Sequence, residues 1–308
     1  MNNFMRPPVY YPAAVVFVDD SDSYLGALRR YFPDMSADLF FTRPQHALAF
    51  IREHVRERTA RSVESLAERD ILARHARFSE VAAIVVDYDM PEMSGVEFLS
   101  SIPNLQCAKV LLTGVADERI AMQAFNAGIV DLYLRKSDLD SASRLTHFLK
   151  EAIGWHCSQN GLGSVEKAVT YSDPRTRNVI DTLIATENIV EYYWRPKQNA
   201  VLMFDRAGKP SVFVAWRADD WAFHAETVTA NGGSAELRNV MDRREAMPVF
   251  WPHETFQPDA EFRALTPRAI PDFDGAYYCW MPLDPAQLDV SPLSFADWRK
   301  DQKPRASA

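Results

Sequence analysis

The segment IVVDYDMPEMSG, at residues 84–95, decides how the first half of this chain folds. It begins within the apolar run VAAIVV (81–86), and a run without polar positions is typical of a strand buried on both faces. Asp87 follows the strand directly, and Pro91 and Gly95 then interrupt regular structure. The segment therefore predicts a buried strand, a carboxylate at its carboxyl end, and a turn beyond it.

Similar units lie on both sides of this segment. Further apolar runs, at 13–18, 37–42, 108–112 and 130–134, predict four more strands. Each strand is followed by a stretch of helical periodicity, at residues 24–32, 44–78, 96–102, 118–128 and 138–157. This alternation predicts a doubly wound, five-stranded parallel sheet, in which functional groups collect at the carboxyl ends of the strands.

Polar side chains stand at those strand ends. Asp19 and Asp20 end the first strand, Asp87 the third, Thr113 the fourth, and Lys136 the fifth. Carboxylates that meet in one pocket repel each other, and oxygen ligands with room for water and phosphate suit Mg²⁺. A carboxylate beside Mg²⁺ and a lysine can attack a phosphoryl donor, because both cations neutralise charge on the transferred group.

At this point the chain resembles a known family, the receiver domains of two-component response regulators. The resemblance runs from about Ala13 to Trp155 and is carried by VVFVDD, IVVDYDMPEMSG, KVLLTG and DLYLRK, in that order. Its most specific element is the D-x-x-M-P-x-M-x-G motif that starts at Asp87. The resemblance implies a flavodoxin-like fold for a receiver domain at residues 1–157.

The resemblance also implies a role for each strand-end residue. Asp87 would accept the phosphoryl group and, with Asp20, would ligate Mg²⁺ directly. Asp19 would act on the metal largely through water, and the main-chain carbonyl of Asp89 would be a further ligand.

Three other positions would complete the site. Lys136 would pair with the phosphoryl group, Thr113 would bond it as the switch hydroxyl, and Tyr133 would be the aromatic that moves inward on activation. Two positions beyond Thr113, the apolar Val115 cannot orient an attacking water, and slow autodephosphorylation is therefore expected.

The chain departs from the family pattern at two places. Ser137 follows Lys136 where the family commonly has proline, so the turn there is expected to differ. The helical segment 44–78 is longer than a receiver needs. Either a second helix folds back, or the extension projects as a protein-binding arm or docks on the other half. We favour projection or docking.

The second half has the pattern of a smaller α+β domain. A polar linker at 158–172 leads to Asp173-Pro174, which are favourable residues for starting a helix. Three strands then form an antiparallel meander, and helices follow within a sensor-like output domain at 173–298. The tail at 299–308 is predicted to be disordered.

No catalytic signature is recognisable in the second half, such as a phosphate-binding glycine loop or a nucleophile elbow. Asp220 and His224 are four residues apart on a predicted helix and could share a metal, although such pairs are more often a cap and a surface contact. The aromatic residues around the meander are more often core than the lining of a ligand cavity. Self-phosphorylation and autodephosphorylation of the receiver are the expected chemistry.

Charge and composition narrow the class further. The formal net charge is −8, and both halves are acidic, with 17 Lys and Arg against 20 Asp and Glu before Glu151, then 17 against 22. This balance argues against nucleic-acid binding. The three cysteines fit neither a disulfide framework nor a zinc site, and no apolar run reaches the ~20 residues that span a membrane. A cytoplasmic location is expected.

The leading hypothesis is therefore a bacterial response regulator that takes phosphate from a histidine kinase or phosphotransfer protein. Its C-terminal domain would bind a protein or ligand and not DNA. Phosphorylation is expected to promote homodimerisation through residues 118–155, a face that offers charges of both signs. Two alternatives remain, a receiver-controlled enzyme with an unrecognised catalytic domain and an atypical transcription regulator.

Overall fold

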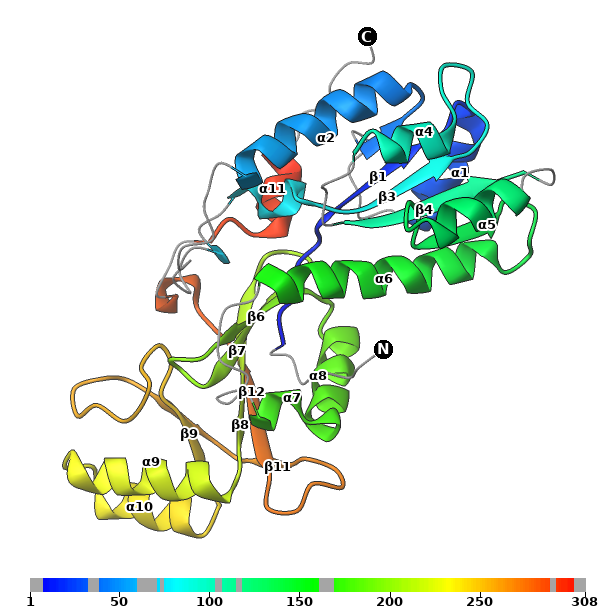
Figure 1. Cartoon of the computed structure of the whole chain (residues 1–308). Coiled ribbons are helices and arrows are strands. Elements are labelled where there is room, and N and C mark those ends of the chain that lie inside the picture. The colour runs from blue at the N-terminus through cyan, green and yellow to red at the C-terminus, as the bar shows by residue number, and fades with distance from the viewer. Residues whose placement is uncertain are drawn as a thin grey trace. The chain divides into compact units, whose positions relative to one another are not determined.

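The chain forms two compact units, each built on a five-stranded sheet (Figure 1). The structure, a computed structural model, describes residues 8–32, 39–59, 71–72, 75–102, 107–114, 118–160, 169–288 and 292–301. The parallel-sheet unit comprises Pro12–Ser65, His75–Gln159 and Trp298–Ala308. The antiparallel-sheet unit comprises Met1–Tyr11, Leu66–Arg74 and Asn160–Asp297, so the units are not the two consecutive halves that the sequence predicted.

The sheet of the first unit has the order β2-β1-β3-β4-β5, with every neighbouring pair parallel. Its strands are β1 (Ala14–Val18), β2 (Phe40–Phe41), β3 (Val81–Asp87), β4 (Ala108–Thr113) and β5 (Leu132–Arg135). This is the flavodoxin-like, doubly wound sheet that the sequence predicted, and that prediction is confirmed.

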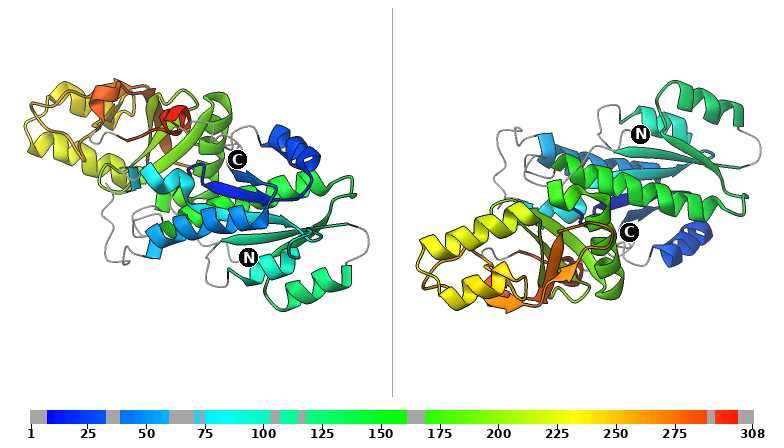
Figure 2. Two further views of the ribbon diagram at one scale, coloured as in Figure 1. Left: turned by 90° about the horizontal axis from the view of Figure 1, so that it is seen from above. Right: turned by 90° about the horizontal axis from the view of Figure 1, so that it is seen from below.

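Every residue of β1 and β3 is buried. Because side chains alternate between the two faces of a strand, both faces of this sheet must be covered, and helices cover them. Val16, Val18, Ile84 and Val86 share one hydrophobic cluster with residues of three helices, α2 (Pro44–Thr59), α4 (Gly95–Ser100) and α5 (Glu118–Asn126). The remaining helices of this unit are α1 (Asp22–Tyr31) and α6 (Ser141–Asn160). Figure 1 shows α6 on the side of the sheet away from α2 and α4, and the two views of Figure 2 face those two sides.

Two boundaries differ from the sequence predictions, and a third segment is described only in part. Of the predicted helical segment 44–78, the structure describes α2 as far as Thr59 and a 3-10 helix (η2) at His75–Ser79; residues 60–70, 73 and 74 lie outside the described residues, so the course of the extension stays a prediction. The predicted linker, 158–172, is helical at both ends, because α6 runs to Asn160 and α7 spans Val169–Ser172. The disordered tail is wrong for residues 299–301, which close helix α11 (Phe295–Asp301).

The sheet of the second unit is antiparallel, with the order β11-β12-β8-β7-β6. The predicted meander is β6 (Ile189–Arg195), β7 (Ala200–Asp205) and β8 (Pro210–Trp216), and the sheet continues with β12 (Tyr277–Pro282) and β11 (Arg268–Ala269). A separate pair is formed by β9 (Met247–Val249) and β10 (Arg263–Leu265). Near the N-terminus, Tyr10 adds a bridge to Tyr192 of β6.

Helix α8 (Pro174–Thr186) begins where the sequence predicted, since the Asp173 side chain accepts a hydrogen bond from the amide of Arg175 at 2.9 Å. The preceding turn of helix, α7, holds Tyr171, which is fully buried. Its hydroxyl donates to the carbonyl of Asn199 and accepts from the amide of Ala215 at 3.0 Å. One phenol thus joins the helical segment to two positions on the sheet.

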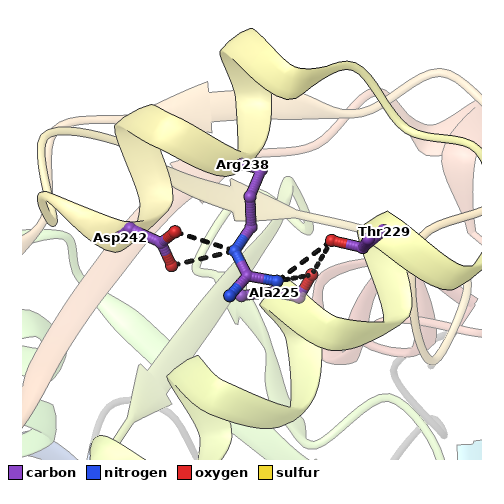
Figure 3. A network of polar contacts seen from close by, with 4 residues as sticks. All are labelled: Ala225, Thr229, Arg238 and Asp242. Atoms are coloured by element: carbon purple, nitrogen blue, oxygen red, sulfur yellow. Dashed lines mark hydrogen bonds and ion pairs between the residues drawn. The ribbon is translucent and has the colours of Figure 1, made fainter.

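Helices α9 (Ala218–Ala230) and α10 (Ala235–Asp242) pack together and are joined by Arg238 (Figure 3). The Nε of Arg238 donates to both carboxylate oxygens of Asp242, at 2.9 and 2.8 Å. Its Nη1 donates to the carbonyl of Ala225 and to Oγ1 of Thr229, each at 3.0 Å. One guanidinium therefore connects the end of α10 to the second half of α9.

We expect Arg238→Met to lower the free energy of unfolding by about 1 kcal/mol, because charge-assisted hydrogen bonds between two helices are lost while the aliphatic stem still packs. Arg243→Met is the matched control, because within the described part of the chain Arg243 pairs with the exposed Glu245 two residues further on, and the unfolding midpoint of this variant should equal that of the wild type. Urea unfolding followed by tryptophan fluorescence measures both. An equal loss in the two variants would show that the connection between the helices contributes nothing.

Candidate functional site

Three carboxylates meet at the carboxyl edge of the parallel sheet, as the strand ends predicted. Asp19, Asp20 and Asp87 each offer an oxygen, and these oxygens lie within 4.8 Å of one another. Asp19 and Asp87 are buried, and Asp20 is exposed to solvent. Two members of the group are therefore buried, and the third is open to solvent.

Lys136 lies against this group. Its Nζ is 2.6 Å from Oδ2 of Asp19 and 2.9 Å from Oδ1 of Asp87. The lysine is held from the main chain as well, because its amide donates to the carbonyl of Thr113 at 3.0 Å. The ammonium thus bridges the ends of β1 and β3 from a position just beyond β5.

The protonation states of Asp87 and Lys136 follow from their surroundings. Burial raises the pKa of Asp87, and the hydrogen bond and charge of Lys136 oppose that rise only in part. For Lys136, burial acts to lower the pKa, but the two aspartates outweigh it and the pKa is raised. Lys136 is therefore charged at neutral pH. Ionisation of Asp87, in contrast, lowers the stability of the folded state.

The donor set fits a hard divalent cation. Three carboxylate oxygens at this separation are ligands that Mg²⁺ prefers, and the exposed Asp20 leaves room for water and phosphate on the same ion. Asp89, two residues beyond Asp87, is also exposed. The residues present therefore fit Mg²⁺.

The glycine of the D-x-x-M-P-x-M-x-G motif has a role that the sequence alone did not reveal. A Cβ at Gly95 would lie 2.4 Å from the carbonyl oxygen of Asp87 and 2.8 Å from Cδ1 of Leu111. Only glycine allows α4 to start this close to the end of β3. Ser94 then caps that helix in a capping box with Glu97, which ties down the chain after Asp87.

The structure also places the predicted switch residues. Thr113 is buried at the end of β4, one strand away from Asp87. Tyr133 is half-buried on β5, where its ring meets Phe125 edge-on with centroids 6.5 Å apart. Lys136 and Ser137 form a turn without a cis peptide bond. Val115, with its prediction of slow autodephosphorylation, lies outside the described residues.

Among the described residues, Asp220 and His224 belong to no group of three or more potential metal ligands. Asp220 accepts from the amide of Arg217 at 2.8 Å and from Nδ2 of Asn199 at 3.3 Å, so it acts as a helix cap. His224 stacks on Trp216 with centroids 4.3 Å apart, and burial lowers the pKa of His224 to about 4. Within the described part of the chain, Asp19, Asp20 and Asp87 are the acidic group that could hold an ion.

Asp87→Asn should stabilise the metal-free protein at neutral pH. The folded-state pKa of Asp87 lies above its unfolded value, so ionisation destabilises the fold. This penalty is absent below the unfolded pKa of ~3.9 and complete above the folded pKa, so the gain of the variant should grow as the pH rises through that window. Urea unfolding in EDTA over a pH series measures it, with Asp89→Asn as the control for losing an exposed charge. A variant less stable than the wild type at neutral pH would contradict this assignment.

Comparison with known proteins supports the assignment of this unit. The family model "Response regulator receiver domain" matches residues 44–142. A search of curated proteins found no match. The fold matches a solved structure of the Legionella pneumophila response regulator LqsR, with a TM-score of 0.68, 24% identity, and coverage of 98% of this chain and 97% of that one.

Two other solved structures match about half of this chain. They are an adenylate cyclase from Rhodopirellula baltica (23% identity, TM-score 0.33, 46% of this chain and 87% of that one) and a receiver domain protein from Clostridium thermocellum (21%, 0.34, 47% and 96%). The family match includes strands β3, β4 and β5 of the parallel sheet, while β1 and β2 lie before residue 44. Residues 44–142, within the parallel-sheet unit, are therefore identified as a response regulator receiver domain on the family match.

Proposed function

We propose that this protein is a response regulator of a bacterial two-component phosphorelay, which accepts a phosphoryl group on Asp87 from a histidine kinase or a phosphotransfer protein. The observation that carries the proposal is the Lys136 ammonium between Asp19 and Asp87, beside three carboxylates that fit Mg²⁺. A nucleophile, a fixed cation and a set of metal ligands are what phosphoryl transfer to a carboxylate requires.

In the proposed reaction, a carboxylate oxygen of Asp87 attacks the phosphorus of a phosphohistidine. The new P–O bond forms as the P–N bond breaks, and the imidazole nitrogen keeps the bonding electron pair. Lys136 pairs with one phosphoryl oxygen, and the Thr113 hydroxyl donates to another. Mg²⁺ would be held by Asp20, Asp87 and the carbonyl of Asp89, with Asp19 acting largely through water, and it would neutralise charge on the transferred group.

The signal would leave the receiver through the face that includes α5, β5 and α6. Thr113 moves toward the phosphoryl group and Tyr133 follows it inward. This face carries exposed apolar side chains, since Met122 and Phe125 are three residues apart on α5 and both are about half exposed. Leu139, just before α6, is fully exposed. A second copy of the chain would cover these side chains in a two-fold dimer through residues 118–155.

For the antiparallel-sheet unit we propose binding of a protein or ligand, and not of DNA. The acidic charge of the second half supports this assignment, because DNA affinity depends on clustered Lys and Arg. We also propose a cytoplasmic location, where Cys107, Cys157 and Cys279, which are buried and form no disulfide, would stay reduced. No described helix is long and apolar enough to cross a membrane.

With Mg²⁺ and a small phosphodonor such as acetyl phosphate, the wild type should form an acid-stable, base-labile acyl phosphate, and Asp87→Asn should not. Asp20→Ala should raise the Mg²⁺ concentration needed, because one anionic ligand is lost. Thr113→Ala should still be labelled but should not give the downstream response. Labelling is read by intact-protein mass spectrometry, and equal labelling of Asp87→Asn and wild type would rule out Asp87 as the acceptor.

Phosphorylation should enhance dimerisation, since exposed ion pairs contribute only ~0–1 kcal/mol each and the unphosphorylated dimer should be weak. Phe125→Asp should raise the dissociation constant of the phosphorylated dimer at least about tenfold, because a charge would replace a ring that the second copy of the chain covers in the proposed dimer. Tyr31→Asp, at an exposed aromatic at the end of α1, is the control. Sedimentation with and without a phosphoryl mimic measures the effect.

Two results would contradict this assignment of the dimer face. One is a monomer in both phosphorylation states. The other is a tight dimer that survives Phe125→Asp or charge reversal at Arg119 and Arg135. Either result would mean that the signal leaves the receiver by another surface.

A further inference from the structure

Helix α1 begins directly beside the phosphorylation site. Ser21 is its N-cap, with a side chain that accepts from the amide of Tyr24 at 3.3 Å. The amide of Ser21 in turn donates to Oδ1 of Asp19 at 2.9 Å. Tyr24, in the first turn of the helix, is therefore connected to Asp19 at the end of β1 through two hydrogen bonds and Ser21.

The ring of Tyr24 lies against the lysine of the site. Nζ of Lys136 is 4.6 Å from the centroid of this ring, while it is 2.6 Å from Asp19 and 2.9 Å from Asp87. The ammonium thus has two carboxylate contacts and one aromatic contact, and only 23% of the lysine side chain is exposed. The three partners come from the end of β1, the end of β3 and the start of α1.

The aromatic contact is a cation–π interaction and not an ion pair. Burial raises the pKa of Tyr24, and the positive charge of Lys136 opposes that rise only in part, so the phenol keeps its proton at neutral pH. A lysine ammonium on a flexible four-carbon stem samples many positions unless several contacts hold it. An aromatic face within about 6 Å attracts the cation and restricts that sampling.

We propose that Tyr24 is a positioning residue of the phosphorylation site, whose ring holds the Lys136 ammonium against Asp19 and Asp87, where it meets the incoming phosphoryl group. The inference rests on the proposed function and deepens it. Tyr24 touches neither the acceptor oxygen nor the phosphoryl group in this role. It acts through Lys136, and the ring, not the hydroxyl, is the part that matters.

The test compares Tyr24→Phe, which keeps the ring, with Tyr24→Leu, which removes it. In Mg²⁺ and acetyl phosphate, Tyr24→Phe should be labelled on Asp87 at a rate within about twofold of the wild type. Tyr24→Leu should be about two- to thirtyfold slower, the range that corresponds to losing a cation–π contact. Tyr31→Leu is the control, because Tyr31 lies seven residues further along α1 and is 63% exposed.

A second measurement needs neither metal nor phosphate. An amine-acylating reagent is added to the metal-free protein, and the modification of Lys136 is followed by peptide mass spectrometry. Lys136 should react several-fold faster in Tyr24→Leu, because its ammonium is less confined, and at the wild-type rate in Tyr24→Phe and Tyr31→Leu. A positioning role is overturned if Tyr24→Leu matches the wild type in both measurements, or if Tyr24→Phe loses as much as Tyr24→Leu.

The two measurements separate this inference from the proposed function. If the wild type is never labelled on Asp87, the proposed function fails, and the acylation rates alone decide whether the ring confines Lys136. If the wild type is labelled on Asp87, but neither the labelling rate nor the acylation rate changes when the ring is removed, only the role of Tyr24 fails.

Discussion

The mutual repulsion of Asp19, Asp20 and Asp87 is the constraint on which the receiver site depends. Carboxylate oxygens within 4.8 Å of one another, two of them on buried residues, are unfavourable without a cation. Lys136 supplies one positive charge from within the chain, at 2.6 and 2.9 Å from two of the three groups. The remaining negative charge suits a divalent cation, which is why the unfavourable electrostatics of these residues support the proposed function.

The fold keeps these charges together by packing at a distance from them. Strands β1 and β3 are buried along their whole length, and β3 is the central strand of the five. Because the sheet is close-packed on both faces, the strand ends cannot move apart to relieve the repulsion. Gly95 adds a local restraint, since the backbone beyond Asp87 returns so closely that no side chain fits there. Packing of the core thus offsets the electrostatic repulsion between the carboxylates at the edge of the sheet.

In the antiparallel-sheet unit, by contrast, the polar side chains described above stabilise the fold. The Tyr171 hydroxyl bonds two main-chain groups, Asp220 caps α9, and Arg238 joins α9 to α10. His224 is neutral and stacked within aromatic packing. These roles explain why the second half shows polar residues at suggestive spacings without a recognisable chemical motif. A carboxylate at a cap and a carboxylate in a catalytic site have the same local sequence pattern.

The sequence by itself determined the parallel sheet, its five strands and the candidate residues at their carboxyl ends. These features are local, because strand burial appears as uninterrupted apolar runs and each site residue directly follows its own strand. The helix start at Asp173 was also predictable from the sequence, since a cap depends on neighbours within three residues.

Only the tertiary structure decided which distant residues meet. Tyr24 and Lys136 are separated by most of the receiver sequence, and nothing local to either residue indicates their contact. The bridge between Tyr10 and Tyr192, which adds the N-terminal segment to β6, is a contact of the same kind. Edge strands such as β11 and the pairing of β9 with β10 were missed because two or three residues carry too little periodicity to read. Such contacts depend on how the whole chain is folded and packed, and a local pattern of residue types does not record that.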